Sequence, residues 1–340
     1  MSGAVKPGAL RRGSTLAVVT PASAAKAELV RAGIDCLEGL GYRTKLMPHA
    51  LDRGPLYYAG TAEARAGDLM AAFADKAIDG IVCTRGGWGS AELLPLLDAA
   101  VVRANPKVFV GYSDHTSLHT WLAREAGLVT FYGPMVAADF GRADGFDRAS
   151  WGHAVGGDSE WALTASDGLR VLRAGVAEGT LAGGCIAILA EGLGTPYAML
   201  PATVDASPQR ASSPGTPDAS PQRASSPGIP DAPRVLFLED IGTKPYQWDR
   251  MLLHLRYAGM LEQVSGIVFG DMRQCVAAEE DALLEAAILH ALRDFAGPIA
   301  IGLRSGHVDT PNVTVPLGVR VRLDLREGPR LEFLEAAVEG

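Results

Sequence analysis

The chain has 340 residues, 48% of them hydrophobic and 21% charged, with a formal net charge of −8. This is the composition of a globular protein with a large core, and the length favours two domains. The acidic balance argues against nucleic-acid or anionic-membrane partners, which need a basic surface. The apolar runs are too short for a signal-peptide core or a membrane span, and the four cysteines are widely spaced. We therefore expect a cytoplasmic protein with reduced thiols.

The first 140 residues alternate apolar strands with helical patterns. Strands are predicted at 16–20, 43–47, 79–84, 107–111 and 129–132, and helices at about 30–37, 62–73, 91–97 and 117–126. This order predicts right-handed crossovers and an α/β fold with a doubly wound, mainly parallel sheet. Functional side chains are expected at the carboxyl ends of its strands.

Ser113 is the candidate nucleophile of this sheet. The apolar run 107–111 breaks at Gly111 and presents Ser113 just before a predicted helix. A strand, a tight turn and a helix in this order display a nucleophile, although His115 stands where the elbow pattern Gly-x-Ser-x-Gly has its second glycine. A serine that only caps the helix is the alternative interpretation.

Two later strands end in groups that would complete a catalytic relay. The run 234–240 ends in the carboxylate of Glu239, and the run 298–302 leads to His307. The imidazole would take the serine proton and pass it to the leaving amine, while the carboxylate would fix the tautomer. Taken alone, Glu239 is also compatible with a surface acid, and His307 with a loop histidine bonded to the backbone.

A glycine-rich loop follows the strand at 79–84. Its glycines, Gly86 and Gly87, would let backbone N–H groups approach a ligand as a phosphate cradle or an oxyanion hole. The phosphate interpretation is weak because neither Gly-x-Gly-x-x-Gly nor the P-loop lysine pattern is present. Next to the nucleophile, an N–H of this pair together with the amide of Asp114 would hold the tetrahedral oxygen.

Two side chains of the same loop are candidates for substrate binding. Arg85 would bind a substrate carboxylate through its planar guanidinium, and Trp88 would line the cleft. A tight turn with a solvated arginine is the alternative. His115 and His119 have the i, i+4 spacing of a metal pair, but Thr116 stands where a zinc-protease helix has glutamate. We therefore predict no metal site.

A poorly patterned segment, 141–175, is predicted to link the N-terminal unit, 1–140, to a second α/β unit, 176–340. The second unit is expected to contain segments at 181–189, 235–239, 247–261, 266–270, 279–295, 299–302, 313–315, 319–325 and 330–334. The last two are predicted to form a hairpin. Within it, 205–215 recurs at 218–228, rich in Pro, Ser and Gly, so we expect a disordered insertion at about 202–233.

Five blocks, in order, resemble the LD-carboxypeptidase family, which includes muramoyltetrapeptide carboxypeptidase and the microcin C self-immunity proteins. The blocks are residues 84–90, 111–116, 181–189, 236–251 and 306–318. The resemblance implies a cytoplasmic serine peptidase, commonly a homodimer, without metal or organic cofactor. It implies a triad of Ser113, Glu239 and His307, and an N-terminal doubly wound domain followed by a β-rich α/β domain.

The reaction that the resemblance implies is hydrolysis of the amide between an L-centre and a D-residue. The implied example is release of D-alanine from murein tetrapeptide in cell-wall recycling. The alternatives are a microcin C-type hydrolase acting on a peptidyl- or aminoacyl-nucleotide, and an inactive muropeptide-binding protein. The sequence departs from the family at Cys185, where asparagine is usual, and at Ser305, where an aromatic residue is frequent. Both departures would reshape the cleft.

Overall fold

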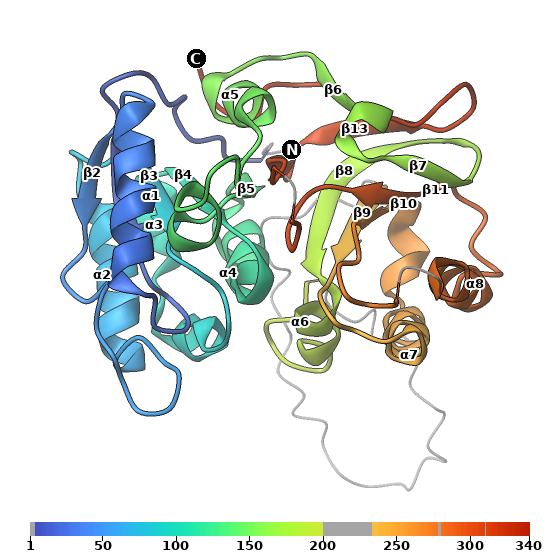
Figure 1. The fold of residues 1–340 in the computed structure, drawn as a ribbon, viewed down its shortest axis with the longest axis horizontal. Coiled ribbons are helices and arrows are strands. Elements are labelled where there is room, and N and C mark those ends of the chain that lie inside the picture. Colours follow the sequence, from blue (N-terminus) through green and yellow to red (C-terminus); the bar gives the residue numbers. More distant parts are fainter. Residues whose placement is uncertain (1–3, 200–232, 278–279, 310) are drawn as a thin grey trace, which may run out of the picture.

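The computed structural model describes residues 4–199, 233–277, 280–309 and 311–340, and shows two sheets side by side (Figure 1). The first sheet has the strand order β12-β5-β4-β3-β1-β2, and the second has β6-β14-β13-β8-β9-β10-β11-β7. The α/β fold class predicted from the sequence is thereby confirmed. The repeated segment 205–228 lies outside the described residues.

The first sheet is built from the apolar runs of the N-terminal region. Its strands are β1 (Thr15–Val19), β2 (Arg43–Leu46), β3 (Gly80–Cys83), β4 (Val108–Gly111), β5 (Thr130–Tyr132) and β12 (Val315–Leu317). The first five are parallel. Every residue of β3, β4 and β5 is buried, as expected for strands covered on both faces.

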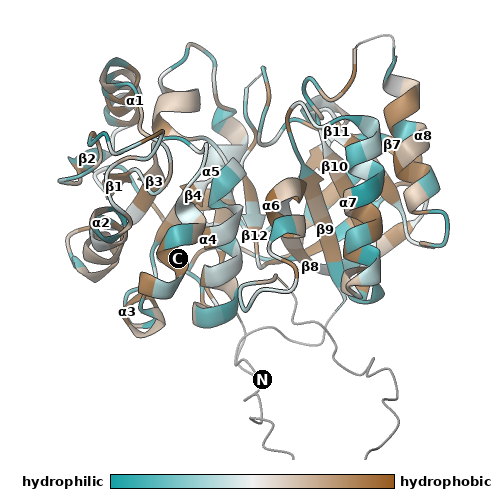
Figure 2. Ribbon diagram, turned by 90° about the horizontal axis from the view of Figure 1, so that it is seen from below, coloured by the Kyte–Doolittle hydropathy of each residue, from teal (hydrophilic) through white to brown (hydrophobic). Residues whose placement is uncertain are grey.

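Helices cover both faces of this sheet. They are α1 (Ala27–Gly39), α2 (Ala62–Ala74), α3 (Ala99–Ala104), α4 (Thr116–Trp121) and α5 (Arg148–Gly156). Short 3-10 helices, η1 (Ser90–Leu96) and η2 (Ser113–His115), and short π-helices, η3 (Leu122–Ala126) and η4 (Val136–Phe140), accompany them. Figure 2 shows α1 on one face and α2 and α3 on the other. This arrangement follows from a chain that runs outward from β1 to β2 and then back through β3 and β4.

The second sheet is mixed. Its strands are β6 (Trp161–Thr164), β7 (Arg170–Arg173), β8 (Val176–Cys185), β9 (Arg234–Glu239), β10 (Val264–Gly270), β11 (Ile299–Leu303), β13 (Arg320–Asp324) and β14 (Arg330–Phe333). Strands β8 to β11 are parallel, and β13 and β14 form the predicted antiparallel hairpin. The remaining elements are α6 (Ile186–Glu191), α7 (Pro245–Tyr257), α8 (Asp281–Ala291), η5 (Ala165–Asp167) and η6 (Met260–Gln263).

Two features differ from the sequence-based expectation. The segment 141–175, expected to be a linker, contains α5, β6 and β7, and the two strands form the edges of the second sheet. Short edge strands have weak periodicity, which explains why they were missed. The segment near 313–315 gives β12, which pairs antiparallel with β5 of the first sheet. The division into domains near 140 and 175 stays a prediction.

The apolar side chains form two clusters. One fills both faces of the first sheet and continues beneath β8 and β13, and the other lies between β9 to β11 and the helices α6 to α8. The carboxyl ends of β4, β5, β8 and β9 meet where the sheets adjoin. None of the helices in the described ranges is long and apolar enough to cross a membrane.

Candidate active site

Ser113 sits at a sharp turn between β4 and α4. Its backbone has a φ of +66°, in the left-handed region that non-glycine residues rarely adopt. The turn is tight, because a Cβ on Gly111 would lie 2.7 Å from Nδ1 of His115. Strained backbone of this kind concentrates at functional sites and fits the elbow predicted from the sequence.

The glycine loop after β3 lies against this turn. A Cβ on Gly86 would come within 2.8 Å of Cβ and 3.0 Å of Oγ of Ser113, so only glycine allows the approach. Gly87 has a φ of +106°, and a Cβ there would meet the Ser23 hydroxyl at 2.4 Å. Gly86 is therefore needed for the loop to approach Ser113, and Gly87 is needed for the left-handed backbone packed against Ser23.

Asp114 connects the turn at Ser113 to the glycine loop, because both its side chain and its backbone carbonyl accept hydrogen bonds from Ser90. Its carboxylate accepts the backbone N–H of Ser90 at 2.8 Å, and its carbonyl accepts the Ser90 hydroxyl at 2.6 Å. Burial raises the pKa of Asp114, against the opposing hydrogen bonds from Ser90. The side chain thus has a structural task, and only its backbone N–H is a candidate oxyanion donor.

Glu239, the last residue of β9, and His307, in the loop after β11, form a hydrogen-bonded pair. Nδ1 of His307 lies 2.8 Å from Oε2 of Glu239, and the same oxygen accepts the backbone N–H of His307 at 3.0 Å. Burial opposes both charges, but the attraction and hydrogen bonds outweigh it. They raise the pKa of His307 and lower the pKa of Glu239 from their ordinary values.

The loop that carries His307 is fixed by its neighbours. The Asn312 side chain accepts the N–H of Gly306 at 3.0 Å and donates to its carbonyl at 3.1 Å. Gly306 has a φ of +92°, and a Cβ there would lie 2.5 Å from Cδ of Glu239. Glycine is therefore required for the carboxylate to reach the imidazole.

Tyr112 and Asp139 also lie near the imidazole of His307. The Tyr112 ring stands edge-on to the His307 ring, with 5.2 Å between centroids and an interplanar angle of 89°. Burial, and then the Asp139 carboxylate, raise the pKa of Tyr112. Burial also raises the pKa of Asp139 to about 6.

No hydrogen bond joins the Ser113 hydroxyl to His307 within the described residues. Hydrogen bonds between catalytic groups often tighten only when substrate binds.

Tyr132 was not a candidate from the sequence, yet its hydroxyl contacts both Ser113 and Glu239. Its hydroxyl accepts the backbone N–H of Ser113 at 3.0 Å and donates to Oε1 of Glu239. The available signal was its place as the last residue of β5, which adjoins the strand leading to Ser113. Strand ends alone could not show that its ring reaches the second sheet.

The sheets approach closely beside this tyrosine. A Cβ on Gly184 would meet the Thr116 hydroxyl at 2.6 Å and the Tyr132 ring at 3.1 Å. The backbone N–H of Cys185 donates to the same Thr116 hydroxyl at 3.0 Å. Cys185 and Ser305, the two departures from the family pattern, are both buried.

The two predicted substrate-binding side chains lie on the surface of the glycine loop. Arg85 is exposed and has no ion pair with another residue of the described ranges. Trp88 is 43% exposed, and its backbone N–H donates to the Ser23 hydroxyl at 3.1 Å. Both side chains are therefore free to meet a ligand.

The histidines of α4 and its preceding turn are buried. His119 uses both ring nitrogens, with Nε2 at 2.8 Å from the Gly111 carbonyl and Nδ1 at 2.8 Å from the Thr130 hydroxyl. Burial lowers the pKa of His119 to about 4 and that of His115 to about 3. Across the described ranges, no group of three or more His, Cys, Asp or Glu is placed to hold a metal ion.

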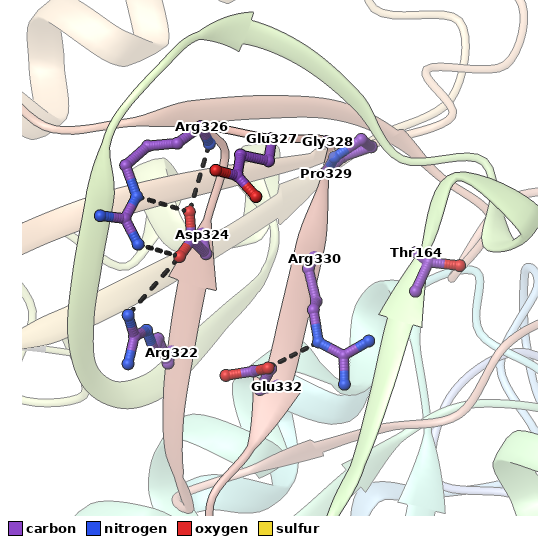
Figure 3. Close-up of a pocket in the computed structure, with 9 residues that line it drawn as sticks. All are labelled: Thr164, Arg322, Asp324, Arg326, Glu327, Gly328, Pro329, Arg330 and Glu332. Carbon is purple, nitrogen blue, oxygen red and sulfur yellow. Dashed lines mark hydrogen bonds and ion pairs between the residues drawn. The ribbon is translucent and has the colours of Figure 1, made fainter.

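A separate cavity of about 600 Å³ lies over the β13–β14 hairpin (Figure 3). Its guanidinium groups are paired with carboxylates of the same hairpin: Arg326 binds Asp324 at 2.6 Å, and Arg330 binds Glu332 at 2.5 Å. The cavity contains no nucleophile and base in contact.

Comparison with known proteins agrees with this geometry. The LD-carboxypeptidase N-terminal domain matches residues 16–133, and the LD-carboxypeptidase C-terminal domain matches residues 219–323. A probable murein peptide carboxypeptidase of Bacillus subtilis is 32% identical over 98% of this chain and 95% of its own. The fold resembles the microcin C7 self-immunity protein, with a TM-score of 0.82, 20% identity, and 98% and 100% of the two chains covered.

A solved structure supports the same assignment. The muramoyltetrapeptide carboxypeptidase of Oxalobacter formigenes has a TM-score of 0.74 and 26% identity, with 95% of this chain and 99% of the other covered. The two domain matches follow the order of the sheets, and the identity to the Bacillus protein extends over nearly the whole length. The chain therefore belongs to the LD-carboxypeptidase family and is a serine carboxypeptidase, a hydrolase of peptide bonds.

Proposed function

We propose that this enzyme is an LD-carboxypeptidase that releases the terminal D-alanine of murein tetrapeptide in the cytoplasm, with Ser113, Glu239 and His307 as its triad. The observation that carries the proposal is the Glu239–His307 hydrogen bond of 2.8 Å beside a serine held at a strained elbow. The relative named as a murein peptide carboxypeptidase supports the substrate class.

In this proposal the reaction has two steps. Oγ of Ser113 attacks the carbonyl carbon while Nε2 of His307 takes its proton, and the tetrahedral oxygen binds backbone N–H groups of Gly86 or Gly87 and Asp114. His307 then protonates the departing amine, and D-alanine leaves an acyl-enzyme on Ser113. Water, activated by the same imidazole, releases the tripeptide and restores the serine.

Substrate selection is assigned to the glycine loop. A carboxypeptidase must recognise the free carboxylate of its last residue, and a guanidinium binds a carboxylate bidentately. Arg85 is exposed beside Gly86, which itself touches Ser113. We assign the carboxylate to Arg85 and a wall of the cleft to Trp88. A homodimer, and the division into an N-terminal and a C-terminal domain, belong to the same proposal.

A microcin C-type hydrolase is the second candidate. The fold matches the microcin C7 self-immunity protein over 98% of this chain, and relatives of that name have been solved with glutamyl sulfamoyl guanosine and aspartyl sulfamoyl adenosine. The substitutions at Cys185 and Ser305 lie close enough to the triad to alter what the cleft accepts.

One experiment decides between these functions. Murein tri-, tetra- and pentapeptides, and in parallel an aminoacyl sulfamoyl nucleotide, are incubated with the enzyme and analysed by mass spectrometry, with Ser113→Ala as the control. We expect tetrapeptide to become tripeptide, and the variant to turn over slower by a factor on the order of 10⁶. Cleavage of the nucleotide alone favours the second candidate. Release of D-alanine that survives in the variant contradicts the triad, and failure of a fluorophosphonate to label Ser113 favours an inactive binding protein.

A further inference from the structure

Tyr132 occupies the junction of the two sheets and makes one hydrogen bond to each side. Its hydroxyl accepts the backbone N–H of Ser113 at 3.0 Å and contacts Oε1 of Glu239. Its side chain is fully buried. One phenol oxygen therefore links the backbone of the nucleophile, on the first sheet, to the acid on the second.

The direction of both hydrogen bonds is fixed by chemistry. A backbone N–H can only donate, and an ionised carboxylate can only accept. The hydroxyl must accept from Ser113 and donate to Glu239. The other carboxylate oxygen takes two donors from His307, so the hydrogen bonds run in one continuous chain from the Ser113 amide to the imidazole.

The tyrosine ring is held from several sides. The Phe237 ring of β9 stands edge-on at 5.4 Å between centroids, and the His119 ring of α4 lies at 5.6 Å. Gly184 of β8 lies against the ring edge, where a Cβ would come to 3.1 Å. Side chains fixed in this way place a hydroxyl more accurately than a solvent-exposed tyrosine does.

We propose that Tyr132 is a positioning residue of the carboxypeptidase reaction: its hydroxyl sets the spacing between the Ser113 backbone and the Glu239–His307 pair, and tunes the basicity of that pair. The inference rests on the triad of the proposed function. Tyr132 acts through Ser113 and Glu239 and does not itself touch the substrate.

Removing the hydroxyl has a defined electrostatic consequence. Glu239 would lose a donor and hold its charge on fewer hydrogen bonds, so it would attract the proton on His307 more strongly. His307 would then be protonated at higher pH, so on acidification its neutral form, which acts as the base, would disappear at a higher pH than in the wild type. Among the described residues, the other titratable groups near the pair are Tyr112, Asp139, Cys185, Asp240 and Cys275. Neither Tyr132→Phe nor Tyr42→Phe alters any of them.

The test compares Tyr132→Phe with Tyr42→Phe. The Tyr42 hydroxyl also accepts one N–H, from Nε1 of Trp151 at 3.1 Å, but at a site outside the triad. We expect kcat on murein tetrapeptide to fall about tenfold to a hundredfold in Tyr132→Phe with little change in KM. The acid limb of kcat/KM, and the His307 titration followed by NMR, should move to higher pH in Tyr132→Phe and stay in place in Tyr42→Phe.

A fluorinated tyrosine at position 132 should shift the His307 titration in the opposite direction to Tyr132→Phe. Fluorine makes the phenol a stronger donor, so the His307 titration should move to lower pH. This variant also decides the question if Tyr132→Phe fails to fold. The inference is overturned if the His307 titration is unmoved by the change at position 132. That outcome differs from failure of the proposed triad, which appears as activity surviving in Ser113→Ala, because the NMR titration needs no substrate.

Discussion

Nδ1 of His307 donates to Oε2 of Glu239 at 2.8 Å, and the backbone N–H of His307 donates to the same oxygen. Because an ionised carboxylate has no proton to give, the shared proton belongs to Nδ1, and Nε2 is left with its lone pair. This is the tautomer that a general base for Ser113 requires. The pair is buried, with the imidazole 16% and the carboxylate 2% exposed, so water screens their attraction weakly.

The first prediction concerns the pH dependence of the wild-type enzyme. Although burial opposes the charge, Glu239 raises the pKa of His307 above the ordinary histidine value. In the proposed triad only neutral His307 can take the serine proton, so kcat/KM should fall as the pH drops through this raised pKa. The acid limb should therefore lie above about pH 6.5, the ordinary histidine value. A pH profile of tripeptide release measures it, and a limb below that value would contradict the pairing.

Glu239→Gln tests the origin of that limb. The amide keeps the shape of the side chain but removes its charge, so His307 loses the attraction that raises its pKa. The acid limb should move to lower pH, and kcat should fall by a factor on the order of 10⁴, less than in Ser113→Ala. The measurement is a pH profile of both enzymes under one set of conditions. A limb unchanged by loss of the carboxylate would remove Glu239 from the relay.

Gly86→Ala tests the close approach of the glycine loop. The new methyl group would lie 2.8 Å from Cβ of Ser113, so the loop or the elbow must move. We expect kcat to fall by about 10² to 10³, the cost of losing one oxyanion donor, while the fold survives. Gly67→Ala is the matched control, because a Cβ on Gly67 in α2 meets nothing within 4 Å. Equal activity of the two alanine variants would argue against an oxyanion role for this loop.

The central strands and the elbow were predictable because their signals are local. Strands β3 and β4 are short apolar runs that end at the glycine loop and at Ser113, and the parallel order places both ends at one edge. Glu239 and His307 likewise follow apolar runs. The sequence could thus indicate three chemical groups at strand ends, although their approach depends on how the sheets pack.

The features that were missed depend on tertiary contacts. Strand β12 pairs with β5, and the register places Val315 opposite Tyr132, 183 positions earlier in the chain. No local sequence pattern reports a pairing over that separation. Segment 141–175 holds edge strands too short for clear periodicity, though Asp147 does cap α5 by accepting the N–H of Ser150. Tyr132 looked like a core residue of a strand, and only the junction of the sheets gives its hydroxyl two polar partners.

The last prediction concerns stability. Burial lowers the pKa of His119 to about 4, and both its nitrogens are already hydrogen-bonded in the neutral form. The unfolded chain would bind a proton near the ordinary value of about 6.5, so the unfolded state binds more protons between these two values. Stability is therefore lost as the pH falls through this window, and this one side chain should account for about 2 kcal/mol between pH 7 and pH 5.

His119→Gln should remove that dependence. Urea unfolding at pH 7 and pH 5 gives the difference in the free energy of unfolding, which should be smaller by about 2 kcal/mol in the variant, whatever the substitution costs at pH 7. His254→Gln, on an exposed position of α7, is the control and should leave the difference unchanged. If His119→Gln keeps the full wild-type difference, the buried imidazole is not what makes the fold sensitive to acid.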